Sequence, residues 1–319
     1  KKQIWLVMEK RTEARDNGYH FFKYLRNMHP EVEAYYVISH DSADLPKINH
    51  LGNIIEADSF KHYVYYLAAK YSISSQAYGA APGNPRIVHK FKKYFAPNQK
   101  TIFLKHGIIK DDMTDAYRYD ITKFELFCCG AKREHDYIIE KYGYPKEKAK
   151  LLGLCRYDRL FQQQHKNKKQ ILIMPTFRNW LQASNPVGEA SDSELESFIK
   201  SDYYYQYISL ISDKELQDFA RDRGYKIVFY PHYAMQPYIR AFKSFQNDVL
   251  LIGSRKEYDV QDLLIESGIL ITDYSSVYFD FAYMKKPVIY FQFDEQEYRG
   301  KHYKKGYFDY RKGGFGPVL

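Results

Sequence analysis

Short apolar runs alternate with amphipathic segments throughout the first half of the chain. Each run is too short to be a helix of its own and is typical of a buried strand. The runs cover residues 4–8, 35–39, 54–55, 71–74, 101–104, 126–129 and 151–154. Between them, apolar residues recur at helical spacing, as in 18–28 (Phe21, Phe22, Leu25), 59–70 (Tyr63, Tyr66, Leu67, with Ser59 as cap) and 131–142. This alternation predicts βαβ units around a mostly parallel sheet.

The second half repeats the pattern after a polar, basic stretch at residues 162–170. Strands are predicted at 171–174, 226–230, 249–252, 268–272 and 288–291, and helices at 194–223 (with a break near Asp213), 260–266 and 277–284. We therefore predict an α/β protein with two domains, 1–165 and 166–319. A length of 319 residues is sufficient for two such cores.

Composition narrows the class of partner. The net charge of +9 favours an anionic ligand such as a nucleotide, a phosphate polymer or an acidic membrane surface. No run approaches the roughly 20 apolar residues of a membrane span. The three cysteines, Cys128, Cys129 and Cys155, have no metal-binding spacing, and we expect buried free thiols in a reducing, cytoplasmic compartment. The chain begins without Met, and we interpret it as a domain excised from a larger protein.

In parallel sheets, ligands bind at the carboxyl ends of strands. One such end is the stretch 270–280, where Asp273 ends a strand and Ser275 and Ser276 open a helix. Hydroxyls and free N–H groups at a helix start suit a phosphate. An ordinary turn with a capping serine explains the same residues.

A second strand end carries Lys105, His106, Gly107 and Lys110. A histidine there is placed to act as a general base, because its ordinary pKa is near ~6.5. The two lysines would hold an anion, and Asp111 or Asp112 would orient the imidazole. The alternative is a loop histidine beside a turn glycine.

Further polar residues follow other strands: Arg156, Thr176, Arg178 and His232. Arginine suits bidentate phosphate contacts, although a salt bridge that stiffens the turn is equally consistent with Arg156. Two βαβ halves would form a cleft, with His106 on one wall and Arg178, His232 and residues 273–276 on the other. The chain has no GxGxxG after its first strand, no GxxxxGK[ST] and no HExxH or Cys/His cluster, so nicotinamide, phosphate-loop and zinc chemistry are not indicated.

Five motifs occur in one order: KHGIIK at 105–110, GLCRYD at 153–158, PTFR at 175–178, PHY at 231–233 and LITDYSSVYFDF at 270–281. In this order they resemble the CDP-glycerol glycerophosphotransferase family, the teichoic acid primases and polymerases. The resemblance covers nearly the whole chain. Lys105 and Ile108 depart from the family's commoner Trp-His-Gly-Thr form.

The resemblance implies a GT-B fold: two Rossmann-like domains with a cleft, the acceptor on the N-terminal side and the CDP-activated donor on the C-terminal side. It implies transfer of a polyol phosphate with release of CMP, without a cofactor or metal. The family's two essential histidines fall on His106 and His232. Its donor-binding positions fall on Ser275, Ser276 and Asp280, and less closely on Arg156, Thr176 and Arg178; Gly107, Lys110 and Asp273 complete the predicted substrate-binding set.

Alternatives remain open at this point. The donor is CDP-glycerol, CDP-ribitol or, for a GT-B glycosyltransferase, another nucleotide sugar. A basic, Tyr-rich module that binds an anionic polymer without catalysis, or a regulatory part of a larger polymerase, also fits; no nucleic-acid motif is present. The expected acceptor is a polyol-phosphate or lipid-linked glycan, which implies a peripheral position on the inner face of the cell membrane.

Overall fold

The computed structural model describes residues 3–84, 87–88, 94, 96–185 and 188–319. The chain forms two compact units. Unit 1 contains Lys1–Ile109 and Met113–Asp158, and unit 2 contains Lys110–Asp112 and Arg159–Leu319. The last division lies inside helix α8 (Tyr157–Gln163), whereas the sequence predicted a boundary between residues 165 and 166.

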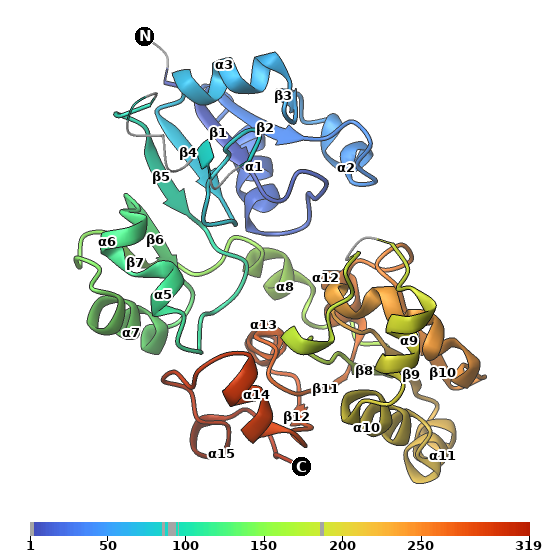
Figure 1. Cartoon of the computed structure of the whole chain (residues 1–319). Helices are drawn as coiled ribbons and strands as arrows, with labels where there is room; N and C mark the ends of the chain where they lie inside the picture. The colour runs from blue at the N-terminus through green and yellow to red at the C-terminus, as the bar shows by residue number, and fades with distance from the viewer. Residues whose placement is uncertain (1–2, 85–86, 89–93, 95, 186–187) are drawn as a thin grey trace. The chain divides into compact units, whose positions relative to one another are not determined.

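Unit 1 is built on a seven-stranded parallel sheet in the order β3-β2-β1-β4-β5-β6-β7 (Figure 1). Its strands are β1 (Trp5–Met8), β2 (Ala34–Ile38), β3 (Ile54–Glu56), β4 (Tyr71–Ser74), β5 (Lys100–Phe103), β6 (Leu126–Cys129) and β7 (Ala149–Leu151). Its helices are α1 (Asn17–Met28), α2 (Leu45–Asn49), α3 (Phe60–Ala68), α5 (Thr114–Tyr117), α6 (Tyr119–Thr122) and α7 (Lys132–Tyr142). The chain reverses direction across the sheet between β1 and β4, which makes this the switch point of unit 1.

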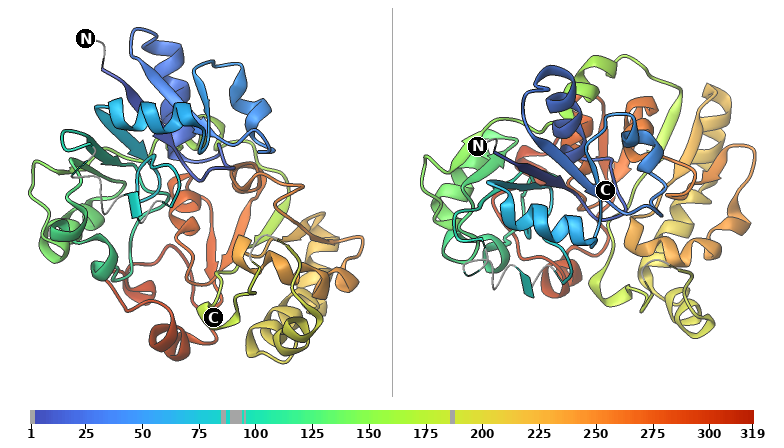
Figure 2. Two further views of the ribbon diagram at one scale, coloured as in Figure 1. Left: turned by 45° about the horizontal axis from the view of Figure 1, so that its top comes forward. Right: turned by 90° about the horizontal axis from the view of Figure 1, so that it is seen from above.

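Both faces of this sheet are covered, because successive side chains of a strand point to opposite faces. Val7 packs with Phe22 and Leu25 of α1, whereas Leu6 packs with Tyr66 of α3 on the other face. The two views of Figure 2 show these helices on either side of the sheet. A doubly wound sheet of this kind leaves only its strand ends open for a site.

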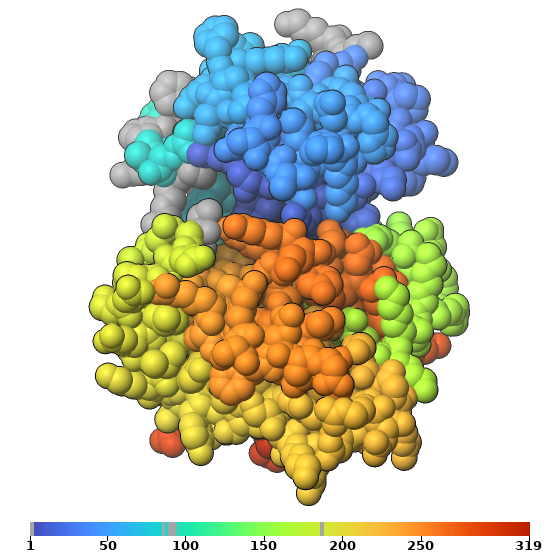
Figure 3. All heavy atoms as spheres, turned by 90° about the vertical axis from the view of Figure 1, so that its right-hand side faces the viewer, coloured from blue at the N-terminus to red at the C-terminus, as the bar shows by residue number. Residues whose placement is uncertain are grey.

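Unit 2 has a five-stranded parallel sheet in the order β10-β9-β8-β11-β12, with its switch point between β8 and β11. The strands are β8 (Gln170–Ile173), β9 (Lys226–Phe229), β10 (Leu250–Ile252), β11 (Ile269–Thr272) and β12 (Val288–Tyr290). The helices are η1 (Asn179–Leu181), α9 (Asp192–Phe198), α10 (Asp202–Ile211), α11 (Lys214–Arg223), η2 (Tyr233–Ala241), η3 (Lys243–Phe245), α12 (Val260–Glu266), α13 (Val277–Tyr283), α14 (Glu295–Lys301) and α15 (Tyr310–Gly313). The yellow segment of α9–α11 lies on the outside of unit 2 (Figure 3).

Every predicted strand is present, with ends shifted by at most two residues except for 151–154, which overlaps β7 only at Leu151. The break near Asp213 is the N-cap of α11, and a second break, which was not predicted, separates α9 from α10. Asp16 is the N-cap of α1. One local expectation was wrong: Tyr63 and Leu67 of α3 are 42% and 50% exposed instead of packing with Tyr66. The expectation of buried free thiols, which rested on Cys128 and Cys129, is confirmed; Cys155 is also free and is partly buried.

Candidate active site

The predicted site residues lie at the carboxyl ends of strands in each unit. In unit 1 the loop after β5 carries the predicted His106, and the loops after β1 and β4 carry Asp16 and Ser75, which were not predicted as site residues. In unit 2 the loops after β8, β9 and β11 carry Thr176, His232 and Asp273. The predicted residues are therefore gathered at two switch points, one in each unit, and each is described by itself below.

The His106 loop is held by a buried ion pair at its base. Lys105, with a left-handed φ of 47°, places its Nζ 2.5 and 2.6 Å from the carboxylate oxygens of Glu134. The same carboxylate accepts hydrogen bonds from the backbone N–H of Ile109 (2.6 Å) and of Gly130 (2.7 Å). Lys105 and Glu134 are 1% and 0% exposed, so Lys105 fixes the loop and does not present its charge to a substrate anion.

His106 itself remains exposed at the tip of this loop, next to the buried Gly107. Desolvation by the surrounding protein lowers the pKa of its imidazole, and the Asp16 carboxylate opposes that shift while Arg156 adds to it. A neutral imidazole is the form that accepts a proton, so the geometry suits a general base. The carboxylate that acts on it is Asp16, which the sequence had not indicated; Asp111 is bound elsewhere.

The side chain and backbone of Arg156 bind other residues of unit 1. Its Nη1 donates to Asp16 Oδ1 at 2.8 Å and to the backbone carbonyl of His106 at 2.7 Å. Its backbone N–H donates to Asn17 Oδ1 at 3.0 Å, and Asn17 Nδ2 donates to the carbonyl of Lys105 at 2.8 Å. Arg156 and Asn17 thus hold the backbone on both sides of the His106 peptide. The salt-bridge interpretation of Arg156 is confirmed, with Asp16 as its partner.

Lys110 belongs to unit 2 although the residues before it belong to unit 1. Its ammonium group pairs with Asp111 and lies 5.6 Å from the ring centre of Tyr310. Burial lowers its pKa. Lys110 is 3% exposed, so in this structure its charge is directed at Asp111.

Asp273 cross-links the switch point of unit 2. Its Oδ1 accepts hydrogen bonds from the backbone N–H groups of Thr176 (2.8 Å) and Tyr274 (2.6 Å). Its Oδ2 accepts from the Tyr207 hydroxyl (3.0 Å) and pairs with Arg178 Nη2 (2.9 Å). Asp273 therefore ties the loop after β8 to the loop after β11.

Arg178 is the central buried cation of unit 2. Its side chain is 0% exposed and forks onto Asp294 with contacts of 2.7 and 3.0 Å, in addition to Asp273. The rings of Tyr203, Tyr274, Phe293 and Tyr298 surround the guanidinium with centres 5.1–5.9 Å away. Two carboxylates neutralise this charge, so Arg178 organises the switch point from within.

Three groups at this switch point keep polar atoms available. Thr176 is 6% exposed and its Oγ1 is buried without a hydrogen-bond partner. Ser275 and Ser276 are partly exposed ahead of α13, where Ser275 Oγ accepts from Val277 N–H at 3.3 Å. The N-cap residue of α13 is Ser276, and its side chain makes no capping hydrogen bond. The phosphate cradle stays a prediction. Asp280 lies in α13 and is 2% exposed.

His232 is half-buried beside the loop after β8. Its ring stacks on Phe177, with centres 4.6 Å apart, and its backbone N–H donates to the carbonyl of Pro175 at 3.3 Å. Its Nδ1 accepts from the Ala234 N–H at 3.2 Å. In the neutral ring the proton is therefore on Nε2, which makes Nε2 a hydrogen-bond donor. A donor of this kind stabilises negative charge on an oxygen.

His302, after α14, is a neighbour that the sequence prediction missed. Its ring packs edge-on against Phe177, with centres 4.5 Å apart, and its Nδ1 accepts from the Asn179 N–H at 3.1 Å. Desolvation lowers its pKa to about 4, so it is neutral near pH 7. Its Nε2 is buried without a partner. No spacing signal marks His302; only the aromatic, charged composition of its surroundings distinguishes it.

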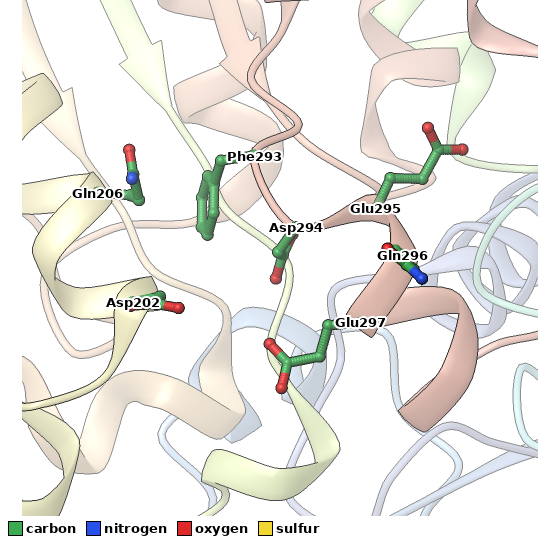
Figure 4. Close-up of a pocket in the computed structure, with 7 residues that line it drawn as sticks. All are labelled: Asp202, Gln206, Phe293, Asp294, Glu295, Gln296 and Glu297. Atoms are coloured by element: carbon green, nitrogen blue, oxygen red, sulfur yellow. The ribbon is translucent and has the colours of Figure 1, made fainter.

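A pocket of about 420 Å³ lies beside the Arg178 cluster of unit 2, because Phe293 and Asp294, which contact Arg178, also line it. Figure 4 shows Asp202 and Gln206 of α10 facing the segment 293–297. Besides Asp294, which binds Arg178, its lining carries three further carboxylates, Asp202, Glu295 and Glu297. Because these would repel a pyrophosphate, we do not assign the donor to this pocket.

Among the residues that the structure describes, no group of three or more His, Cys, Asp or Glu side chains is arranged to hold a metal ion. The described helices also include none that is long and apolar enough to cross a membrane.

The sequence pattern of the family described as CDP-Glycerol:Poly(glycerophosphate) glycerophosphotransferase matches residues 1–319. The chain belongs to this family. The minor teichoic acid biosynthesis protein GgaB of Bacillus subtilis is 36% identical over 325 residues, covering 100% of this chain and 34% of GgaB. A teichoic acid glycerol-phosphate transferase of Staphylococcus aureus is 32% identical over 154 residues, covering 48% of this chain and 33% of that protein. The chain thus spans about a third of the length of these relatives.

Solved structures give the same fold. The wall teichoic acid polymerase TagF matches with a TM-score of 0.68 at 18% identity, covering 100% of this chain and 77% of that chain. A UDP-GlcNAc 2-epimerase from Methanocaldococcus jannaschii, in complex with UDP-GlcNAc and UDP, matches with a TM-score of 0.54 at 9% identity, covering 99% of this chain and 88% of that chain. The predicted α/β, GT-B-like class with two parallel sheets is confirmed.

Proposed function

We propose that this glycerophosphotransferase moves glycerol phosphate from CDP-glycerol to a hydroxyl of a teichoic-acid-like or capsule polymer and releases CMP. Family membership over the whole chain supports the reaction class. A TagF structure obtained after a soak with CDPG supports the donor (TM-score 0.67, 18% identity, covering 99% of this chain and 75% of that chain). The observation that carries the proposal is the exposed His106 at the tip of a loop that Glu134, Asn17 and Arg156 hold.

In the proposed reaction, the acceptor hydroxyl attacks the phosphorus distal to cytidine. The new O–P bond forms as the bond from that phosphorus to the bridging oxygen breaks, and CMP leaves with the electron pair. His106 takes the hydroxyl proton. Phosphoryl transfer depends mainly on positioning and charge stabilisation, which oriented donors supply.

The residues of unit 2 divide into two roles. His232 Nε2–H, Thr176 Oγ1 and the hydroxyls of Ser275 and Ser276 would contact the donor phosphates, with Asp280 in the same donor-binding set. Arg178 would act through Asp273 as a positioning residue, because two carboxylates already bind its charge. In unit 1, Gly107 would let the acceptor approach His106, and Arg156 would hold the His106 backbone.

The primary test is CMP release with a synthetic acceptor and a donor panel of CDP-glycerol, CDP-ribitol, UDP-sugars and GDP-sugars. His106→Gln should lower kcat by about 10²–10⁴-fold while CDP-glycerol still binds. His40→Gln is the matched control, since His40 is 73% exposed and pairs only with Glu56 at 3.3 Å. Wild-type turnover should rise with pH through a pKa below 6.5 and then stay level. Full activity of His106→Gln would remove His106 from the role of base.

The panel also decides between the remaining functions. Turnover of CDP-ribitol alone would make the protein a ribitolphosphotransferase, and turnover of a nucleotide sugar alone would make it a glycosyltransferase. Binding of an anionic polymer with no release of CMP from any CDP-polyol would indicate a non-catalytic module.

We further propose that the protein binds the inner face of the cell membrane through α3. Phe60, Tyr63, Val64 and Leu67 share one stripe of this helix and are 84%, 42%, 44% and 50% exposed. The net charge of +9 favours anionic lipid. Phe60→Ser with Leu67→Ser should reduce sedimentation with phosphatidylglycerol vesicles several-fold. Phe161→Ser, which removes a side chain that is 60% exposed in unit 2, should not. Equal sedimentation of both variants would exclude α3.

A further inference from the structure

The cations that the sequence predicted for a substrate anion beside His106 are all engaged within the protein. Lys105, Arg156 and Lys110 are 1%, 7% and 3% exposed, and each pairs with a carboxylate of the chain. None of them is placed to neutralise a phosphate at the surface of unit 1. If the acceptor carries a negative charge near its reacting hydroxyl, another group of unit 1 has to meet that charge.

The N-terminus of α1 is a usual place for a phosphate at such a switch point, but the side chain of Glu9 fills it. Glu9 is 2% exposed, and its carboxyl oxygens accept hydrogen bonds from the backbone N–H groups of Arg15 (2.9 Å), Asp16 (2.9 Å) and Tyr19 (2.7 Å). Gly18 makes room for this contact, since a Cβ there would lie 2.8 Å from Glu9 Cγ. These backbone donors are therefore taken, and an anion has to be bound by a side chain.

The loop between β1 and α1 carries three cations, and carboxylates fasten two of them. Arg11 pairs with Asp58 at 2.7 Å, and Arg15 Nε pairs with Asp44 Oδ2 at 2.6 Å. The same oxygen of Asp44 accepts a backbone N–H of the loop at 3.0 Å. These contacts fix the course of the loop that presents the third cation, Lys10.

Lys10 and His106 come from the same end of the sheet of unit 1. Lys10 lies two residues beyond Met8, the last residue of β1, and His106 lies three residues beyond Phe103, the last residue of β5. Met8 and Phe103 are both in register with Ser74 of the intervening strand β4. Because neighbouring strands are about 5 Å apart, the two loops emerge roughly 10 Å from each other.

The ammonium group of Lys10 stays accessible to solvent. Lys10 is 39% exposed, and its Nζ lies 3.3 Å from Oε1 of Glu13, whose side chain is 36% exposed. Exposed pairs of this kind contribute little free energy, so an incoming phosphate can replace Glu13. The charge also acts on His106: burial is the main cause of the lowered pKa of the imidazole, and the charges of Arg156 and Lys10 lower it further.

We propose that Lys10 is the acceptor-binding cation of unit 1 and holds the phosphate group next to the hydroxyl that His106 deprotonates. The inference deepens the proposed function and rests on it. Lys10 makes unit 1 selective for an acceptor that ends in a polyol phosphate, because a neutral glycan end has no charge for the ammonium group to bind.

Two synthetic acceptors isolate this contact. Both end in the same glycerol hydroxyl, which is attached through a phosphodiester in one and through an uncharged methyl phosphotriester in the other. With CDP-glycerol as donor, Lys10→Gln should raise the KM for the phosphodiester acceptor about 5–10-fold, because a charged contact at a partly exposed site is lost. Its kcat, and its KM for the phosphotriester, should change less than about twofold. Added salt should raise the KM for the phosphodiester more in wild type than in Lys10→Gln.

Three further variants complete the test. Lys10→Arg keeps the cation and should restore most of the affinity. Glu13→Gln removes the competing carboxylate and should lower the KM for the phosphodiester acceptor. Lys100→Gln is the matched control and should leave both KM values unchanged. Lys100 is 43% exposed and pairs with Glu125 at 2.6 Å, but it is the first residue of β5 and lies at the opposite end of the sheet.

The possible outcomes are distinct. An unchanged KM for the phosphodiester in Lys10→Gln would overturn the assignment, as would an equal rise for both acceptors or an equal rise in Lys100→Gln. If wild type releases no CMP from any donor, the proposed function fails, and calorimetry with the phosphodiester acceptor then decides about Lys10. Weaker binding by Lys10→Gln than by Lys100→Gln would support the contact, and equal binding would overturn it.

Discussion

The two switch points share a strand order but use their charges differently. In unit 1, the buried charges of Lys105, Glu134 and Arg156 surround one exposed histidine, His106. In unit 2, Arg178 is enclosed by carboxylates and rings, and the groups left with available polar atoms are neutral. The comparison shows that the charged residues of both loops are bound within the protein. Under the proposed function, imidazoles and hydroxyls would contact the substrate.

This division has a physical reason. Burying an arginine that pairs with two carboxylates costs less folding free energy than burying one without partners. The paired arginine also fixes the loops that it joins. A donor pyrophosphate would then meet Thr176, His232, Ser275 and Ser276, whose dipoles need no counter-charge. We therefore expect substitution of the hydroxyl residues of unit 2 to lower substrate affinity. We expect substitution of Arg178 to lower the stability of the fold.

The largest effect is expected for Arg178→Met. It leaves Asp273 and Asp294 buried without a cation and should cost about 3–5 kcal/mol of unfolding free energy. Urea denaturation measures this loss. Arg221→Met, which removes a pair that is 47% exposed, should change stability by less than about 0.5 kcal/mol. Similar values for the two variants would contradict the scaffold role of Arg178.

A smaller loss is expected for Glu134→Gln in unit 1, about 2–3 kcal/mol. The variant should also lower kcat, because the N–H groups of Ile109 and Gly130 lose a charged acceptor. Unchanged kcat in folded protein would show that Glu134 does not position His106.

Thr176→Val tests the neutral donors directly. Its Oγ1 has no partner in the protein, so stability should be unchanged while the Kd for CDP-glycerol rises about 5–10-fold. Thr272→Val is the matched control: its Oγ1 donates to the carbonyl of Met174 at 2.7 Å, and the variant should lose about 1 kcal/mol of stability with donor affinity retained. Reversed results would place the donor elsewhere.

The smallest effect concerns His302 in acid. Its pKa is about 4 in the folded protein and near its ordinary 6.5 when unfolded. Between these values the unfolded chain binds the extra proton, so stability falls as pH drops from about 6.5 to about 4. His302→Gln should show a shallower decline of the melting temperature over that window. An identical decline would mean that His302 does not titrate there.

The sheets were predictable because short apolar runs between turn residues rarely form anything other than buried strands. Sequence also located His106, His232 and residues 273–276, since each directly follows such a run. It could not tell which side chain pairs with which. The contacts between Lys105 and Glu134, Arg156 and Asp16, and Arg178 and Asp294 join positions far apart in the chain. His302 follows a helix, where no strand end marks it.

The placement of residues 110–112 also has a consequence for separating the two units. Expression of residues 1–158 alone would produce a fragment that carries three residues of unit 2, with Asp111 deprived of Arg299. Unit 2 expressed alone would lack these residues, and the backbone at Gly306 would lose its close contact with Lys110 and Asp111. A peptide covering residues 110–112 should therefore raise the melting temperature of separately expressed unit 2.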